Sequence, residues 1–149
     1  MIKIRLANKK DIPEVYKLGK ILSELSFSNK FPFHERTELK EFVKNRKENI
    51  FLVAEDNKKV IGFVFAKILA HGSGGWCMLD NLAVDNKFRN HGVGSLLLNE
   101  IYRVIKERKI YYVQILEEIH HKRTRKFWRD KGFKEERVFI WADKFLRQK

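Results

Sequence analysis

Apolar and polar residues alternate along the chain with two different periods. Alternation over Ile2–Leu6 predicts a strand with one buried face, and apolar residues three or four positions apart then predict a helix. Asp11, followed by Pro13 and Glu14, has the pattern of a helix N-cap. The predicted apolar face of this helix consists of Ile12, Val15, Leu18, Leu22 and Leu25.

The rest of the chain continues in the same way. An aromatic loop over Ser26–Phe33 separates the first helix from a second one. Gly62 is expected to mark a close approach between two backbones, because glycine lacks a Cβ. The other predicted elements are a helix over Thr37–Arg46, strands over Ile50–Glu55, Val60–Ile68 and Trp76–Val84, a helix ending near Arg108, and strands over Ile110–Leu116 and Val138–Asp143.

The stretch Leu79–Leu98 combines a strand, a short basic loop and the start of a helix. The first N–H groups of a helix have no partner within the helix and lie at the positive end of its dipole, so they bind anions. Glycines at positions 92 and 94 allow a phosphate to approach those amides, and Arg89 adds a bidentate donor. This junction is therefore predicted to bind a pyrophosphate.

The segment LAVDNKFRNHGVGSLLL, residues 82–98, resembles motif A of the GNAT superfamily of N-acetyltransferases. In that family the loop holds the pyrophosphate of acetyl-coenzyme A (acetyl-CoA). By resemblance, cofactor binding is assigned to Arg89, Asn90, His91, Gly92, Val93, Gly94 and Ser95. A bulge in the preceding strand, which in the family frees a backbone N–H for the thioester carbonyl, implicates Leu82, Ala83 and Val84. A dinucleotide-binding G-x-G-x-x-G pattern is absent here.

A second resemblance to the GNAT family lies in the segment HKRTRKFWRDKGF, residues 121–133, which is similar to motif B. His121 stands where the family usually has asparagine, so it is expected to contact the pantetheine chain or to move a proton. Trp128, which the resemblance also assigns to the cofactor site, stands where a tyrosine often serves as the general acid, and its indole N–H is too weakly acidic for that task. Either His121 or Tyr112 supplies the proton instead, or the thiolate leaves without a dedicated acid.

Asp80 is the candidate general base, since it lies just before the apolar triplet of motif A. In acetyltransferases of the spermidine/spermine type, which the chain resembles here, an acidic residue occupies the corresponding place. The alternative is a carboxylate at a strand end, in water or paired with a lysine. We expect no metal, because His120 and His121 have no helical His-x-x-x-His or cysteine pair beside them.

Composition narrows the class of protein. The 149 residues are most simply one domain, residues 1–149, and the single cysteine, Cys77, excludes an internal disulfide framework. No secretory signal or membrane-spanning run is apparent, so we expect a cytoplasmic protein that does not act at membranes. The net charge of +13 fits a lysine-rich background, attraction of coenzyme A, or nucleic acid contact. We favour the background, and we do not expect a nucleic acid partner.

The resemblance implies a single three-layer α/β domain (α+β in some schemes). It has a mixed, mostly antiparallel sheet flanked by helices and splayed between Trp76–Val84 and Ile110–Leu116. The implied activity is acetyl-CoA dependent N-acetylation of a primary amine of a small molecule, polyamines among the candidates. A protein or peptide N-acetyltransferase and a non-catalytic acyl-CoA binding module remain open as alternatives. A monomer or a homodimer is expected.

Overall fold

The computed structural model describes residues 1–22, 33–144 and 146. These residues form two compact units, Met1–Leu116 and Glu117–Lys149, and each is described by itself. Two sequence predictions, Leu25 in the first helix and most of the aromatic loop Ser26–Phe33, lie outside the described residues.

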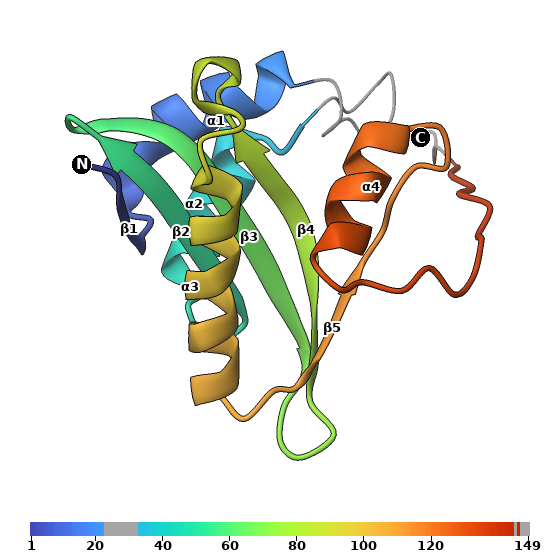
Figure 1. The fold of residues 1–149 in the computed structure, drawn as a ribbon. Coiled ribbons are helices and arrows are strands. Elements are labelled where there is room, and N and C mark those ends of the chain that lie inside the picture. The colour runs from blue at the N-terminus through green and yellow to red at the C-terminus, as the bar shows by residue number, and fades with distance from the viewer. Residues whose placement is uncertain (23–32, 145, 147–149) are drawn as a thin grey trace. The chain divides into compact units, whose positions relative to one another are not determined.

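The first unit contains a five-stranded sheet in the order β1-β2-β3-β4-β5 (Figure 1). Neighbouring strands are antiparallel except β4 and β5, which run parallel, so the predicted mixed, mostly antiparallel sheet is confirmed. The strands are β1 (Lys3–Leu6), β2 (Asn49–Asp56), β3 (Lys59–Ala70), β4 (Trp76–Val84) and β5 (Tyr112–Ile115).

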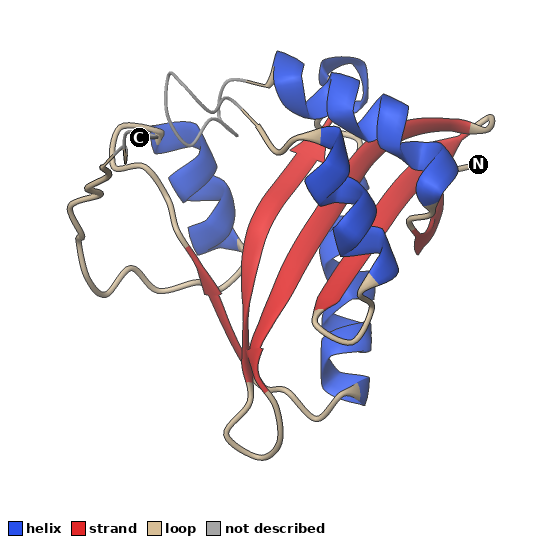
Figure 2. Ribbon diagram, turned by 180° about the vertical axis from the view of Figure 1, so that it is seen from behind, coloured by secondary structure: helices blue, strands red, loops and turns tan. Residues whose placement is uncertain are grey.

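Helices cover both faces of this sheet. Figures 1 and 2 show α1 (Ile12–Ile21) and α2 (Arg36–Lys44) on one face and α3 (Val93–Glu107) on the other. The apolar core beneath α1 and α2 includes alternate strand residues, among them Phe63, Phe65 and Ala83. Alternation places successive side chains on opposite faces, so β3 is buried on both.

Close backbone packing explains Gly62 in β3. A Cβ built there would lie 2.9 Å from the carbonyl oxygen of Ala83 in β4, so the predicted close approach is confirmed. The turn between β2 and β3 has positive φ angles at Asn57 and Lys58, 48° and 64°, as a two-residue hairpin turn of type I′ needs.

Asp11 is the N-cap residue of α1, as predicted, but its side chain makes no capping bond to that helix. Instead, Asn8 and Asp11 form a capping box around a 3₁₀ turn, η1 (Lys9–Asp11), and Arg5 donates to both carboxylate oxygens of Asp11 at 2.8 Å. The Asp11 carboxylate is thus bound by Arg5 of β1 and by the N–H of Asn8, and the N-cap pattern does not indicate those partners.

In the second unit, α4 (Lys122–Asp130) has Lys131 as its C-cap, and Gly132 has a φ of 89°, which agrees with the predicted glycine stop. The predicted strand over Val138–Asp143 is wrong: these residues have no regular secondary structure. The side chains of Val138, Phe139, Ile140 and Trp141 are exposed. A strand needs a neighbouring backbone for its hydrogen bonds, and an apolar β-branched pattern alone does not provide one.

Candidate active site

A β-bulge at Asp80 interrupts β4. In the register between β3 and β4, Phe65 lies opposite Asn81 and Ala66 lies opposite Leu79, so Asp80 is an extra residue. The resemblance placed a bulge near Leu82–Val84, and the structure instead has it at Asp80. Backbone bulges leave no fixed side-chain pattern, so the sequence could not locate it.

The parallel pairing of β4 with β5 ends at the same place. Its last pair is Leu79 with Ile115, and within the described residues no β5 partner is paired with Asp80 or the rest of β4. Figure 1 shows the two strands diverging from this point. The predicted splay is therefore present, and it leaves one backbone edge of β4 without a strand neighbour between Asp80 and Val84.

Asp80 is partly buried on β4. Burial raises the pKa of its carboxyl group, while the nearby basic groups of His34 and Lys67 act in the opposite direction. The net effect is a raised pKa, which makes the carboxylate a better proton acceptor than an ordinary surface aspartate. His34 and Lys67 were not predicted as site residues, because only the fold brings them near Asp80.

Asn81, the next residue, is 5% exposed. Its Oδ1 atom is buried and has no hydrogen-bond partner among the described residues. A buried acceptor without a donor costs free energy, about 1–3 kcal/mol. Such a cost beside a bulge and a carboxylate is typical of functional sites, where a ligand or a water molecule supplies the missing donor.

The predicted anion-binding loop joins β4 to α3. It contains a 3₁₀ turn, η3 (Asn86–Phe88), and left-handed backbone at Asn90 and Gly92, with φ of 63° and 80°. Arg89 Nε donates to the carbonyl oxygen of Val84 at 3.1 Å, which ties the loop to the end of the strand. The His91 ring nitrogen Nδ1 lies 2.8 Å from the carbonyl oxygen of Arg89.

These residues fit a pyrophosphate. Gly92 is the N-cap of α3, and a Cβ built on it would meet nothing within 4 Å, so the helix N-terminus is open at this point. The first turn of α3 carries no acidic side chain that would repel an anion. Val93, Gly94 and Ser95 form the start of the helix, where backbone N–H groups point outward. The loop is therefore suited to hold the cofactor's phosphates.

The remaining predicted site residues lie elsewhere. Tyr112 of β5 pairs with Trp76 of β4. Trp76 precedes Asp80 by four residues, which is about 13 Å along the strand, so the structure does not bring Tyr112 and Asp80 together. The Tyr112 hydroxyl accepts a hydrogen bond from Gln114 at 3.2 Å. In the second unit, His121 precedes α4 and its Nε2 lies 3.4 Å from Glu118.

Trp128 is the buried centre of the second unit, 6% exposed. The rings of Phe127 and Phe133 contact it edge-on, with centroids 5.2 and 5.1 Å away. Its Nε1 donates to a carboxylate oxygen of Glu117. Burial raises the pKa of Glu117, and this hydrogen bond partly offsets that rise. The indole N–H is thus bonded within its own unit, which supports a packing role.

We expect Trp128→Ala to destabilise the protein by about 3–5 kcal/mol, because it leaves a cavity among the aromatic rings. Trp128→Phe should cost less, since the ring is kept and only the bond to Glu117 is lost. Chemical denaturation measures both. Trp141→Ala is the matched control, because Trp141 is 71% exposed and should lose little. Equal losses for the alanine and phenylalanine variants would contradict this packing role.

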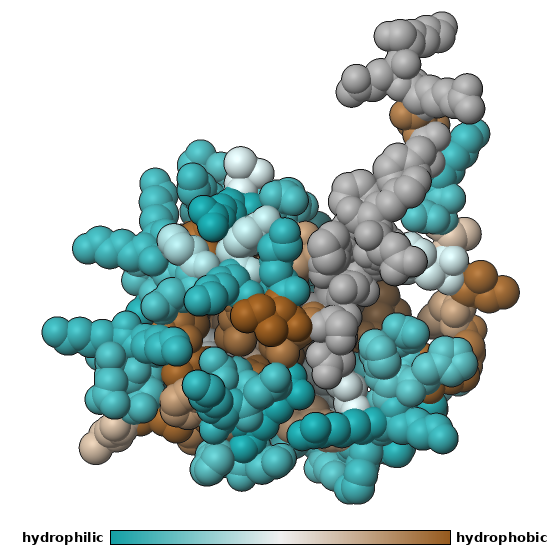
Figure 3. Space-filling view, turned by 90° about the horizontal axis from the view of Figure 1, so that it is seen from above, coloured by the Kyte–Doolittle hydropathy of each residue, from teal (hydrophilic) through white to brown (hydrophobic). Residues whose placement is uncertain are grey.

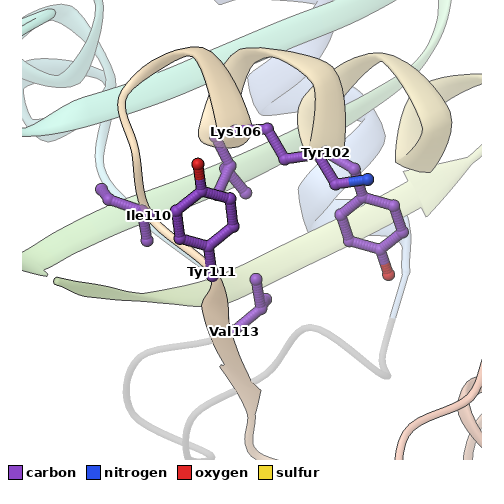
Figure 4. Close-up of a pocket in the computed structure, with 6 residues that line it drawn as sticks. Tyr102, Lys106, Ile110, Tyr111 and Val113 are labelled. Carbon is purple, nitrogen blue, oxygen red and sulfur yellow. The ribbon is translucent and has the colours of Figure 1, made fainter. Parts of the chain in front are cut away.

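A cavity of about 200 Å³ lies between the C-terminal half of α3 and the start of β5 (Figure 4). Tyr102 and Lys106 line it from α3, together with Ile110, Tyr111 and Val113. Tyr102 and Lys106 follow Val93 by roughly 14 and 20 Å along the helix axis, so the cavity is separate from the loop at residues 89–95. We therefore assign it no part in pyrophosphate binding.

Comparison with known proteins identifies the family to which the chain belongs. The sequence model of the acetyltransferase (GNAT) family matches residues 18–133. The chain therefore belongs to the GNAT family, and it is an N-acetyltransferase of the kind that takes its acetyl group from acetyl-CoA. No curated protein sequence matches the chain.

Solved structures share the fold at low sequence identity. An aminoglycoside acetyltransferase from an uncultured soil metagenomic sample, in complex with trehalose, is 18% identical with a TM-score of 0.79 and 97% coverage of each chain. The PaiA N-acetyltransferase of Thermoplasma acidophilum, in complex with coenzyme A, is 18% identical with a TM-score of 0.81 and 93% coverage of each chain. A possible acetyltransferase of Clostridium difficile 630 is 14% identical, with a TM-score of 0.80 and 99% coverage of each chain.

Among the described helices, none is both long and apolar enough to cross a bilayer. The described side chains also contain no group of three or more His, Cys, Asp or Glu residues placed to hold a metal ion. Hydrophilic side chains cover most of the face seen in Figure 3, with smaller hydrophobic areas between them.

Proposed function

We propose that the protein transfers the acetyl group of acetyl-CoA to a primary amine of a small molecule, with Asp80 as general base. The observation that supports this proposal is that three features of β4 occur at the same residue. The bulge, the end of the β5 pairing and a carboxylate with a raised pKa all occur at Asp80, five residues before the anion-binding loop begins at Asp85.

Residues 89–95 hold the pyrophosphate in this proposal, through the α3 backbone and Arg89. The backbone of Leu82, Ala83 and Val84, on the β4 edge that β5 leaves, provides hydrogen-bonding groups alongside the acyl end of the cofactor. Bound acetyl-CoA supplies a thioester, whose sulfur leaves with the bonding electron pair.

Asp80 acts on the acceptor amine. Most amines are protonated at neutral pH, and an ammonium nitrogen has no lone pair with which to attack a carbonyl. Asp80 takes that proton, directly or through a water molecule, so that the nitrogen can form the new N–C bond as the C–S bond breaks. After the N–C bond has formed, the nitrogen carries one proton more than an amide does. That proton passes to the leaving sulfur, directly or through water, and the products are the amide and the thiol of coenzyme A.

No dedicated side-chain acid is required for that last proton. An ordinary thiol has a pKa of about 8.5, so a thiolate is a tolerable leaving group near neutral pH. We expect His121→Ala and Tyr112→Phe each to keep turnover within about tenfold of wild type, measured by thiol release at saturating acetyl-CoA. A hundredfold loss in either variant, with cofactor binding intact, would identify that residue as the acid.

The proposed function is tested by thiol release from acetyl-CoA with a panel of amines. The panel contains polyamines, aminoglycosides, amino acids and peptides with free N-termini. A small amine that is acetylated more efficiently than every peptide supports the proposal. Preference for peptides would favour a protein N-acetyltransferase, and binding of acetyl-CoA with no thiol release from any amine would favour a non-catalytic module.

A further inference from the structure

Three titratable residues from separate parts of the first unit, Asp80, Lys67 and His34, lie near Phe65, which is on the face of the sheet that α2 covers. Asp80 is the bulged residue beside Asn81, which lies opposite Phe65. Lys67 follows Phe65 by two positions on β3 and so shares its face. His34 packs against Phe65 from the segment before α2, with ring centroids 6.2 Å apart.

Aromatic contacts fix the position of His34. Its ring is edge-on to Phe42 of α2 at 5.0 Å and to Phe33 at 5.4 Å, and its side chain is 13% exposed. Phe42 in turn stacks on Phe65 at 4.3 Å. A ring that is packed on several sides keeps a defined orientation. The position of His34 is therefore fixed by the sheet face and by the segment that leads into α2.

The charge of the cluster is unusual for a site that receives a cation. Within the described residues, the charged groups that act on Asp80 are His34 and Lys67, and both are basic. The carboxylate of Glu38 lies 3.7 Å from His34 Nδ1, so His34 has an acidic neighbour of its own. Lys67 is therefore the cation of this cluster that is left to act on a ligand at Asp80. A polyamine or an aminoglycoside carries several ammonium groups, which such a surface repels.

We infer that the natural acceptor carries an anionic group close to its primary amine, as an amino acid does. This inference rests on the proposed function. The acceptor amine faces Asp80, and its anionic group faces Lys67 and His34. The buried Oδ1 of Asn81, beside Asp80, is a further acceptor for an amine N–H. A carboxylate and a phosphate would both suit the basic pair, so the experiment includes one acceptor of each kind.

The test compares acceptors that differ in one group. Ornithine and putrescine, and lysine and cadaverine, differ only by a carboxylate. Phosphoethanolamine is compared with β-alanine, because both carry an aminoethyl group, on a phosphate and on a carboxylate respectively. We expect kcat/KM to be at least tenfold higher for ornithine than for putrescine, and for lysine than for cadaverine. Phosphoethanolamine shows which anion is preferred. Equal or better use of putrescine and cadaverine would overturn the inference and leave the proposed function standing.

Variants of Lys67 test whether this residue causes the preference for ornithine over putrescine. Lys67 is exposed, so Lys67→Gln should fold normally. We expect it to raise KM for ornithine at least tenfold and to lower KM for putrescine, while the Kd of acetyl-CoA stays unchanged. Lys67→Glu should shift the preference toward putrescine. The matched control is Lys59→Gln, an exposed lysine at the other end of β3, opposite Asp56. An equal KM change in the Lys59 variant would overturn the assignment to Lys67.

A binding measurement separates recognition of the acceptor from acetyl transfer to it. Calorimetric titration of ornithine and putrescine into the protein without acetyl-CoA reports acceptor recognition directly. Tighter binding of ornithine that weakens at least tenfold in Lys67→Gln supports the inference even if no amine releases thiol, in which case only the proposed function fails. Equal affinity for the two amines in the wild-type protein would overturn the inference.

Discussion

Replacing Asp80 by asparagine is expected to lower turnover at neutral pH by about a hundredfold or more, the usual contribution of a general base. Asparagine has nearly the same size but cannot accept the proton of the acceptor amine. Activity should recover partly at high pH, where more of the amine is already neutral. The measurement is kcat by thiol release from pH 4 to pH 10 at saturating acetyl-CoA.

The wild-type profile should rise with pH as Asp80 loses its proton. Burial raises the pKa of Asp80, so that rise is expected above the range of an ordinary aspartate. The same shift predicts the stability of the variant. A carboxyl whose pKa is higher in the folded protein than in the unfolded chain favours folding when protonated, and its ionisation disfavours folding as pH rises.

At neutral pH, Asp80→Asn should therefore be no less stable than wild type, which separates a catalytic loss from unfolding. Asp130→Asn, at an exposed carboxylate of α4, is the control and should keep full turnover. A pH profile for Asp80→Asn that runs parallel to wild type would show that Asp80 is not the base.

Local patterns predicted most of the first unit. The prediction for β4, Trp76–Val84, agrees with the structure at both ends. Helix α3 ends at Glu107, one residue from the predicted boundary. Both elements have strong periodic signals: β4 alternates between buried and half-buried residues, and α3 buries Val93, Leu97 and Ile101 on one face.

Features that depend on specific partners in the folded chain were not predictable. The bulge at Asp80 depends on its register with β3, and the Asp11 side chain bonds to Arg5 and Asn8, which the N-cap pattern does not indicate. His34 reaches Phe65 only because α2 packs on the sheet. The prediction of one domain over residues 1–149 and the site roles of the individual residues remain predictions.

The resemblance to the GNAT family assigned roles to loop residues, which the periodicity of apolar residues cannot do. Arg89 and Gly92 are ordinary loop residues by composition, and only the family motif assigns them a pyrophosphate. The structure then supplies the physical reason for glycine at position 92, namely a left-handed φ at the N-cap of a long helix. The motif, the backbone angle and the open space at Gly92 all fit a bound phosphate. A substitution at this residue therefore tests the pyrophosphate site directly.

Gly92→Val is expected to weaken acetyl-CoA binding by more than a hundredfold, measured by calorimetry. A β-branched side chain at a φ of 80° strains the loop, and its methyl groups occupy the open space at the start of α3 that a phosphate needs. Arg89→Ala should have a smaller effect, because it removes one charge-assisted hydrogen-bonding group, worth about 1.5–3 kcal/mol.

Gly72→Val is the matched control for backbone strain. Gly72 has a φ of 82°, and a Cβ built there also meets nothing within 4 Å, but it lies in the connection between β3 and β4. Both valine variants should therefore lose a similar amount of stability, about 1–3 kcal/mol for a strained backbone. Only Gly92→Val should lose affinity for acetyl-CoA. Unchanged affinity in Gly92→Val would reject the loop as the pyrophosphate site, and an equal loss in Gly72→Val would show that strain alone, wherever it lies, weakens binding.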